Sequence, residues 1–355
     1  MANAFASDNH SILLFCQSQL QSSKNQINDY FGLEEKVNLF QVRFFKKGRE
    51  LWIAIASLIF YFFSKEKPDL IFSRNTFAAY FFSFLNLKIT YETHAPEKGI
   101  RKIIQRVLLN DNNVKKVFIS DALKEIMRNN FDANLKNFLI CADAAPAGRK
   151  ILEESTKKEM RNDLFKELKI KRQSKLIGYF GAFYFGRGIE TIIDLAKKLP
   201  DYDFILYGGT QDDFQTKFED TLITDNLFFG GFINPKKVID KMSCMDLLLM
   251  PYSDKVSIGL SNSDTSKWMS PMKMFEYMSS GVPFISSDIS VLREVLIDEK
   301  NCLLCAHNNM IHWKNAIQRI FQDKHLYENL KKNAFSDYEL KYNWQSRVRL
   351  ILNKT

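Results

Sequence analysis

The chain has 355 residues, of which 46% are hydrophobic and 26% are charged. This composition is typical of a folded protein and excludes an intrinsically disordered chain, and the length favours two domains over one. The formal net charge of +9 suits anionic partners, but no arginine-rich or aromatic–basic run of a nucleic-acid-binding module is present. We therefore expect no nucleic acid among its partners.

Short apolar segments alternate with helical stretches along the chain. Strands are predicted at residues 12–16, 37–44, 69–73, 88–92, 116–120, 138–141, 175–180, 203–207, 227–229, 246–250, 283–286 and 302–305. Because strands that alternate with helices form parallel sheets, and the pattern occurs twice, we predict an α/β protein with two Rossmann-like domains. Ligands of such sheets bind at the carboxyl ends of the strands, so we expect the site in a cleft between the domains.

The segment 156–174 is rich in Lys and Arg and is interpreted as the joint between the two halves. We expect an N-terminal domain at 1–165, a C-terminal nucleotide-binding domain at 166–335 and a C-terminal helix at 336–355. The apolar segment 51–63 is too short to span a bilayer and is interpreted as a buried helix. In the alternative reading it forms a basic, apolar surface with Lys46, Lys47 and Arg49 that rests on a membrane.

The five cysteines are scattered and odd in number, which predicts reduced thiols in the cytoplasm. Cys302 and Cys305 form a C-x-x-C pair, but no second pair completes a zinc site, and the surrounding segment has the pattern of a strand. We interpret both as core cysteines. The first residues lack the basic start and apolar run of a signal peptide, so we expect none.

The most informative segment is 270–283, which begins Ser-Pro-Met-Lys and ends Gly-Val-Pro. Ser270 is predicted as a helix N-cap and Pro271 as the first helical residue. The free N–H groups of that first turn form an anion site suited to a diphosphate, and Lys273 adds a positive charge. Glu276 lies on the same face, one turn on, and its carboxylate can accept two hydrogen bonds from a ribose diol. The alternative is an ordinary amphipathic helix with a solvated Glu276.

This segment resembles the donor-binding motif of retaining GT-B glycosyltransferases of family 4, in which two Glu residues stand at a fixed spacing before Gly and Pro. Glu276 takes the place of the second Glu, which holds the ribose. Ser270, Pro271 and Met272 fall where family backbone amides contact the diphosphate. Trp268 stands where the family has the first Glu, which usually contacts the donor sugar.

The resemblance covers nearly the whole chain. The segment 177–188 resembles the first strand and loop of the family's donor domain. The resemblance implies that Gly181 lets the backbone approach a phosphate and that Arg187 stands at the position of a family cation that binds the diphosphate. Two cations, Arg187 and Lys273, would stand in for a metal ion, so we expect no metal and no cofactor. Phe232 and Ile233 match residues that line the nucleobase pocket.

The first half contains further matches. Residues 89–95 resemble the family's Glu-x-His at a strand end, with Glu92 and His94 in those places. The resemblance implies that His94 reaches the donor sugar in the reaction centre. Arg74 and Asp121 follow other strands and are expected to face the cleft, although Asp121 is equally suited to cap a helix.

Asp201-Tyr-Asp203 has the Asp-x-Asp form of a metal and nucleotide motif found in the other large class of glycosyltransferases. It lies where a strand begins, on the edge of the sheet opposite the expected site. We therefore interpret it as a solvated turn. Family members also begin with a strand and a Gly-rich loop, whereas Met1 falls inside the helix that follows them. About 15–20 residues, including the first strand of the N-terminal domain, are therefore expected to be absent.

The resemblance implies a retaining, metal-independent glycosyltransferase of the hexosyltransferase type, with His94, Arg187, Lys273 and Glu276 as its catalytic residues. It would move a sugar from a nucleotide-sugar donor to a hydroxyl of a glycan or lipid-linked acceptor in the synthesis of surface polysaccharide, lipopolysaccharide or glycolipid. We expect a cytoplasmic protein at the inner face of the cytoplasmic membrane, whose last helix packs back towards the first domain. Two alternatives stay open: a non-catalytic descendant that binds nucleotide without turnover, and a sugar-nucleotide epimerase of the same fold.

Overall fold

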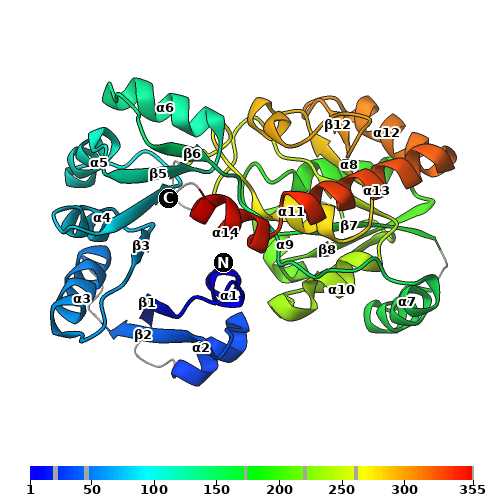
Figure 1. Ribbon diagram of the computed structural model, residues 1–355. Helices are drawn as coiled ribbons and strands as arrows, with labels where there is room; N and C mark the ends of the chain where they lie inside the picture. Colours follow the sequence, from blue (N-terminus) through cyan, green and yellow to red (C-terminus); the bar gives the residue numbers. More distant parts are fainter. Residues whose placement is uncertain (19–22, 44–47, 172–173, 219–221, 260–262, 354–355) are drawn as a thin grey trace. The chain divides into compact units, whose positions relative to one another are not determined.

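The structure, a computed structural model, describes residues 1–18, 23–43, 48–171, 174–218, 222–259 and 263–353 (Figure 1). The chain divides into two compact units. Unit 1 comprises Met1–Ala142 and Trp344–Thr355, and unit 2 comprises Asp143–Asn343. All the predicted strands are present, with ends that differ from the prediction by no more than two residues, and every pair of neighbouring strands is parallel. The predicted α/β fold class is therefore confirmed.

Unit 1 contains two parallel sheets, one of β1 and β2 and one of four strands in the order β3-β4-β5-β6. Its elements are α1 (Ala2–Ser7), β1 (Ile12–Ser18), α2 (Lys24–Phe31), β2 (Val37–Arg43), α3 (Arg49–Phe63), β3 (Leu70–Ser73), α4 (Thr76–Ser83), β4 (Lys88–Thr93), α5 (Ile100–Asn110), β5 (Val114–Phe118), α6 (Asp121–Phe131), β6 (Phe138–Ile140) and α14 (Trp344–Asn353).

The last helix, α14, is part of the core of unit 1. Ile351 packs with Val117 of β5, and Val348 packs with Phe5 of α1. The expected single helix over 336–355 is wrong, because α13 ends at Leu340 and α14 begins at Trp344. The amide of Asn343 donates to the carbonyl oxygens of Tyr338 and Glu339 at 3.3 and 2.7 Å. These carbonyls belong to the last turn of α13, so the side chain of Asn343 satisfies acceptors that a continuing helix would use.

Unit 2 contains one six-stranded parallel sheet in the order β12-β11-β10-β7-β8-β9. Its elements are α7 (Glu154–Leu168), β7 (Lys175–Phe180), α8 (Ile189–Lys198), β8 (Tyr202–Tyr207), α9 (Gln211–Lys217), β9 (Leu227–Gly231), η1 (Pro235–Lys237), α10 (Val238–Ser243), β10 (Leu247–Met250), α11 (Met272–Ser279), β11 (Phe284–Ser287), η2 (Ser290–Glu294), β12 (Leu303–Cys305), α12 (Met310–Gln322) and α13 (Lys324–Leu340).

The strand order of unit 2 is that of a doubly wound sheet. The chain builds outwards from β7 to β9 on one side, then returns to the centre and builds from β10 to β12 on the other. One face is apolar, with Ile177, Phe204 and Leu249 packed against α8 and α12. In Figure 1, α8 and α12 lie on the opposite side of this sheet from α7 and α10. The point where the winding reverses, between β7 and β10, is where such sheets bind ligands beyond the carboxyl ends of their strands.

The predicted domain boundary at residue 165 is wrong, because the Lys- and Arg-rich segment forms helix α7 within unit 2. Arg161 on this helix donates to both carboxylate oxygens of Asp246, at 2.9 and 2.7 Å, and to the carbonyl oxygen of Ser174 at 2.7 Å. Asp246 also accepts from the backbone N–H of Leu176 at 2.7 Å. A bidentate pair with both side chains largely buried fixes α7 to the sheet, so this segment is no free joint.

Two sequence motifs have structural roles in unit 2. Cys302 and Cys305 are unpaired and buried, as expected for core cysteines, and burial raises the pKa of both thiols, that of Cys305 to about 12. The prediction that Asp203 lies in a solvated turn is wrong. Asp203 lies inside β8, is fully buried and accepts a hydrogen bond from the Ser174 hydroxyl, so only Asp201 of the Asp-x-Asp motif is exposed.

Among the described residues, no helix is both long enough and apolar enough to cross a bilayer.

The Arg161–Asp246 pair gives a prediction about stability. Asp246→Ala leaves a largely buried guanidinium and the Leu176 N–H without their acceptor, so we expect a loss of about 3 kcal/mol in the free energy of unfolding. Urea denaturation followed by circular dichroism measures it. The control is Asp163→Ala, because Asp163 lies on α7 itself and forms an exposed ion pair with Lys166. Its loss should lower the free energy of unfolding by no more than about 0.5 kcal/mol. Equal losses in the two variants would contradict the structural role of Asp246.

Candidate functional site

The loops that follow β7 and β10 pack tightly against each other at the reversal point of the unit 2 sheet. Gly188 has a φ of +78°, and a Cβ there would lie 1.8 Å from the carbonyl oxygen of Pro251. Only glycine permits this approach. It allows Arg187 to donate from Nε to the carbonyl oxygen of Ser257 at 3.1 Å and from Nη1 to the hydroxyl of Tyr252 at 3.0 Å. The Arg187 guanidinium is therefore held in place beside the carboxyl end of β10.

Lys273, on the first turn of α11, is the central side chain of this region. Its Nζ lies 3.8 Å from the ring centroid of Tyr179 and 5.3 Å from that of Tyr252. The side chain is buried, and its Nζ has no hydrogen-bond acceptor among the described residues. A Cβ on Gly181 would come within 2.7 Å of this Nζ, so the glycine makes room for the lysine, a role that the sequence did not predict. The two aromatic faces only partly replace the water that the ammonium group loses.

The electrostatics of this cluster favour the binding of an anion. Burial, together with the positive charge of Arg187, lowers the pKa of Lys273 well below its ordinary value, and Glu276 opposes this. Burial raises the pKa of Glu276, opposed by the positive charges of Arg149 and Lys273. An anion bound beside Lys273 and Arg187 would supply the acceptor that Nζ lacks. Strongly shifted groups gathered at a ligand-binding edge are typical of functional sites.

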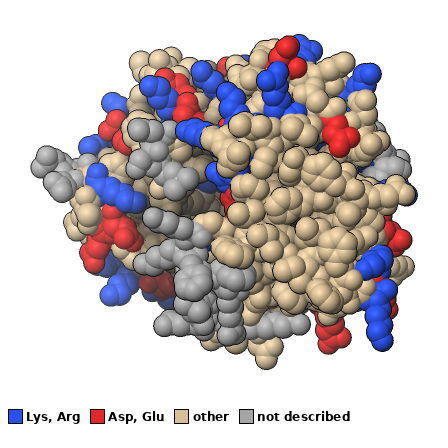
Figure 2. All heavy atoms as spheres, turned by 90° about the vertical axis from the view of Figure 1, so that its left-hand side faces the viewer, with Lys and Arg blue, Asp and Glu red and all other residues tan. Residues whose placement is uncertain are grey.

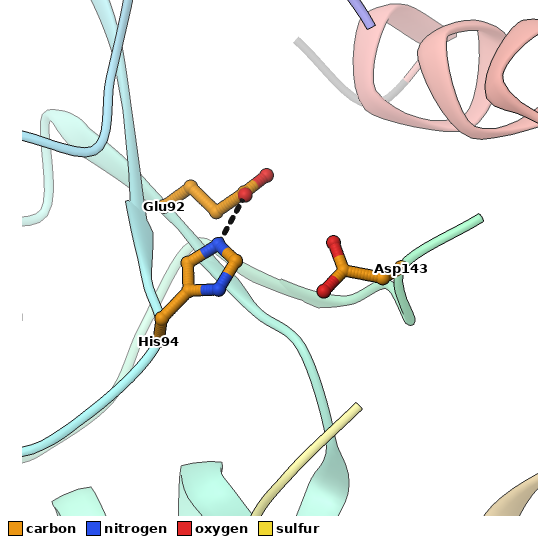
Figure 3. Close-up of side chains that lie close together, drawn as sticks. All are labelled: Glu92, His94 and Asp143. Carbon is orange, nitrogen blue, oxygen red and sulfur yellow. Dashed lines mark hydrogen bonds and ion pairs between the residues drawn. The ribbon is translucent and has the colours of Figure 1, made fainter. Parts of the chain in front are cut away.

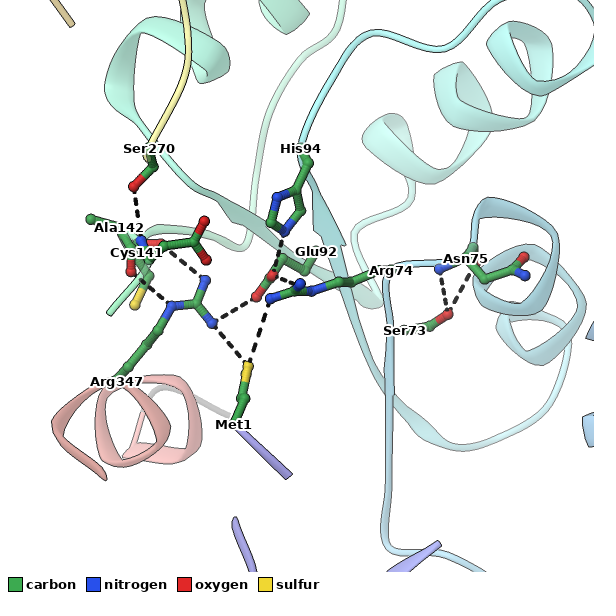
Figure 4. Close-up of polar contacts among 11 residues, drawn as sticks. Met1, Ser73, Arg74, Asn75, Glu92, His94, Cys141, Ala142, Ser270 and Arg347 are labelled. Carbon is green, nitrogen blue, oxygen red and sulfur yellow. Dashed lines mark hydrogen bonds and ion pairs between the residues drawn. The ribbon is translucent and has the colours of Figure 1, made fainter. Parts of the chain in front are cut away.

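The start of α11 differs from the prediction. Pro271 is the N-cap and Met272 the first helical residue, so the helix begins one residue later than expected, with no side-chain cap. The hydroxyl of Ser270 accepts instead from the backbone N–H of Asp143 at 2.9 Å, so Ser270 does not cap the helix (Figure 4). The prediction failed because that contact joins residues far apart in sequence. Lys273 nevertheless lies in the first turn, as predicted.

The remaining donor-side candidates lie near this centre or on neighbouring strands. Trp268 is half-buried in the turn before α11, where its backbone N–H donates to Thr265 at 3.0 Å. Phe232, 74% exposed, and the half-buried Ile233 follow the end of β9, which is two strands away from β7 in the sheet. Met272 is 49% exposed at the start of α11.

A second cluster of charged groups lies in unit 1, at the carboxyl end of β4. Glu92 is fully buried, and its Oε1 accepts from His94 Nε2 at 2.6 Å and from Arg74 Nε at 2.7 Å. Its Oε2 lies 2.8 Å from Nη1 of the buried Arg347 on α14. Figure 3 shows the bond between Glu92 and His94, and Figure 4 shows the two arginines around the same carboxylate. Arg347 also donates to the carbonyl oxygens of Cys141 and Ala142, at 3.1 and 2.7 Å.

Glu92 is held as an anion. Burial opposes its ionisation, but the hydrogen bond from His94 and the charges of Arg347 and Arg74 outweigh burial and lower its pKa to about 2. Because an ionised carboxylate can only accept, the Nε2 atom of His94 donates to Glu92, and in a neutral imidazole with this tautomer Nδ1 is an acceptor. Both oxygens of Glu92 already face cationic groups, so this carboxylate is poorly suited to hold a metal ion.

Of the remaining first-half candidates, Asp121 is neither the helix cap nor a member of the Glu92 cluster. It is the first residue of α6, its neighbour Ser120 caps the helix, and its carboxylate pairs with Lys124 at 2.6 Å. Sequence reasoning also missed Arg149 and Arg347. Arg347 was visible as a basic residue on the last helix, but nothing in the local pattern signalled a bond to a strand more than 200 residues earlier.

Comparison with known proteins identifies the family. The family described as glycosyl transferases group 1 matches residues 160–337. TuaH of Bacillus subtilis, whose name assigns it to teichuronic acid biosynthesis as a glycosyltransferase, is 24% identical over 118 residues, which are 33% of this chain and 28% of TuaH.

Solved structures share the fold. Sucrose-phosphate synthase from Thermosynechococcus elongatus has a TM-score of 0.76 and 14% identity, and the match covers 99% of this chain and 90% of the synthase. HepE from Anabaena, in complex with UDP, has a TM-score of 0.70 and 14% identity over 95% of this chain and 90% of HepE.

These matches and the two parallel α/β units define the fold class as that of the GT-B glycosyltransferases. The chain belongs to the glycosyl transferases group 1.

The Glu92 cluster gives a prediction about Arg347. Arg347→Ala removes one partner of a buried carboxylate, so we expect the protein to lose about 3 kcal/mol in unfolding free energy at neutral pH. Arg349→Ala is the matched control, since Arg349 lies on the same helix and is exposed. If the two variants lose equal stability in urea denaturation, the burial of Glu92 does not depend on Arg347.

Arg347→Ala should also change how the free energy of unfolding depends on pH in acid. The pKa of Glu92 is about 2 in the folded chain and ordinarily 4.5, so its contribution is fully present above pH 4.5 and is lost as the pH falls towards 2. Without Arg347 the folded pKa rises towards 4.5, and the decline in stability between these pH values becomes shallower than in the wild type.

Proposed function

We propose that this protein is a retaining glycosyltransferase that moves a sugar from a nucleotide-sugar donor to a hydroxyl group of a glycan or lipid-linked acceptor. The observation that carries the proposal is Lys273, a buried lysine beside Arg187 at the reversal point of a doubly wound sheet, whose Nζ has no hydrogen-bond acceptor in the described part of the chain. Membership of the glycosyl transferases group 1 and the fold shared with HepE, which was solved with UDP and with UDP-glucose, support it.

The proposed chemistry needs positive charge where the donor's diphosphate leaves. The bond between the anomeric carbon and the diphosphate oxygen breaks, and the acceptor oxygen forms its bond on the same face of the sugar. The acceptor's proton passes to the leaving diphosphate. Lys273, Arg187 and the free N–H groups at the start of α11 stabilise the negative charge that develops there. Because two side-chain cations supply this charge, the proposed reaction needs no metal ion.

Glu276 and His94 have distinct proposed roles. Glu276 accepts hydrogen bonds from the ribose hydroxyls of the donor, and Arg149 helps to keep it ionised against the effect of burial. Arg149 is positioned by Tyr338, whose hydroxyl accepts from its backbone N–H at 3.3 Å and donates to Pro146 at 2.6 Å. His94, oriented by Glu92, offers Nδ1 to a hydroxyl of the transferred sugar.

The proposed acceptor is part of a surface polymer, such as a polysaccharide, a lipopolysaccharide or a glycolipid. The support is the similarity to TuaH, whose name refers to teichuronic acid. The proposed reaction takes place in the cytoplasm, as expected from the reduced cysteines. A second candidate is a descendant that binds nucleotide without turnover. Trp268 favours it, because an indole replaces the carboxylate that contacts the donor sugar in the family.

Nucleotide titration tests the donor site directly. We expect one of UDP, GDP and ADP to bind in isothermal titration calorimetry, and Glu276→Ala to weaken it by about tenfold or more because two hydrogen bonds to ribose are lost. Glu328→Ala is the control, with an exposed carboxylate on α13 of the same unit. If no nucleotide binds to the folded protein, the assigned roles of Arg187, Lys273 and Glu276 are wrong. Binding without sugar transfer from any matching donor would favour the non-catalytic descendant.

Proton uptake on binding tests Lys273. Its pKa is lowered in the free protein, and a bound diphosphate should raise it. Below the lower of these two pKa values, Lys273 is charged in the free and in the nucleotide-bound protein, and it adds no pH dependence to the binding affinity. Between the two pKa values each binding event takes up a proton, and the affinity falls by up to about tenfold per pH unit.

Calorimetry in buffers of different ionisation enthalpy measures this proton. Lys273→Met should abolish the uptake that belongs to the lysine and leave only that of the diphosphate itself. Lys198→Met, at an exposed position on α8, should behave like the wild type. Equal proton uptake by the wild type and Lys273→Met would show that Lys273 does not contact the diphosphate.

A further inference from the structure

Helix α3 exposes an unusual amount of apolar surface. Of its residues, only Ala54 and Ser57 are buried. Trp52 is 42% exposed, Phe62 61% and Phe63 86%. The interpretation of this segment as a buried helix is therefore wrong. A helix that is apolar on all sides is normally enclosed by the rest of the protein, and an exposed patch of this kind usually marks a binding surface.

The apolar surface continues from α3 onto its neighbours α4 and α5, which pack beside it in the order α3, α4, α5. The α3 face, as we name it, consists of the exposed large apolar side chains of this region: Trp52, Ile59, Phe62, Phe63, Phe84, Ile100, Ile103 and Val107. Figure 2 looks onto this side of the molecule and shows a broad area with few charged side chains, which gather at its edges.

Basic residues border the α3 face. Arg49 is the first residue of the helix and Lys65 follows its end, and both are exposed, as are Lys102 and Arg106 on α5. Acidic side chains are also present, since Glu50 and Glu97 share one cationic partner, Arg101, and Glu66 is exposed beside Lys65, but the basic side chains of this region outnumber them. Lys46 and Lys47, which the sequence analysis assigned to the same surface, lie outside the described residues.

We propose that the α3 face binds the surface of an anionic lipid bilayer, with α3 lying in the interface. Trp and Phe side chains favour the boundary between headgroups and acyl chains, and Lys and Arg at the edge attract anionic lipid. A helix of 15 residues rises only about 22 Å, too little to span the hydrocarbon core, so it lies on the membrane rather than across it. The charge at the rim favours a bilayer over a second copy of this chain, whose own rim would repel it.

The proposal goes beyond sugar transfer and does not depend on it. It predicts that the full chain floats with vesicles of phosphatidylcholine and phosphatidylglycerol, and much less with phosphatidylcholine alone. Phe62→Ser with Phe63→Ser should reduce the partition coefficient by about tenfold or more, since both side chains leave the interface. The matched control is Ile311→Ser with Leu340→Ser, because these apolar side chains are 71% and 70% exposed on α12 and α13 of unit 2.

The charged edge is tested separately by Lys102→Glu with Arg106→Glu. This variant should lose binding to phosphatidylglycerol vesicles by about tenfold or more and should remove most of the effect of added salt. Nucleotide titration of all the variants should match the wild type, because none of them alters a residue assigned to the donor site, so a failed donor site and a failed membrane surface give different results.

Three results would overturn the proposal. In the first, the wild-type chain fails to float with anionic vesicles. In the second, the Phe62/Phe63 variant floats as well as the Ile311/Leu340 control. In the third, light scattering shows a dimer that only the Phe62/Phe63 variant dissociates, which would assign the α3 face to self-association.

Discussion

The pairing of β7 with β10 at the centre of the unit 2 sheet determines where this unit can bind a ligand. The winding of the sheet reverses between these two strands, and sheets of this kind bind ligands beyond the carboxyl ends of the strands at that point. The glycines at 181 and 188 then let the two loops and α11 approach closely. Arg187 and Lys273 come close to each other at that point for this reason, although they lie far apart in the sequence.

The buried side chains of Glu92 and Lys273 differ in how the fold compensates their charge. Glu92 is enclosed by Arg74, Arg347 and His94, so its charge is compensated within the fold and its pKa is low. Lys273 packs against aromatic faces, and burial and the charge of Arg187 outweigh the opposing charge of Glu276, so its charged form is disfavoured in the free protein. The first arrangement stabilises a structure and orients a histidine. The second destabilises the free protein, and the anion that we propose to bind there would compensate the charge.

Local patterns in the sequence were sufficient to predict the strands, the fold class and the position of Lys273 in a first helical turn, because alternation, glycines and prolines act over a few residues. Contacts between distant segments were not predictable in this way. The ion pair between Arg161 and Asp246 holds α7 against the sheet of unit 2, so the predicted boundary was wrong. The hydrogen bonds of Asn343 lie at the break between α13 and α14, and Arg347 of α14 pairs with Glu92 of β4. Each depends on which residues the fold brings together, and a single sequence does not contain that information in any local signal.

The environment of helix α3 was also not predictable from its local sequence. An apolar run of this length is compatible with a buried helix and with an interfacial one, because its composition satisfies either apolar environment. The two differ in what the neighbouring elements leave uncovered, and here α4 and α5 pack at its side and extend the apolar surface instead of enclosing it. A protein that meets a lipid-linked acceptor gains from such a surface, since binding to the membrane confines enzyme and acceptor to the same thin layer and raises their local concentration.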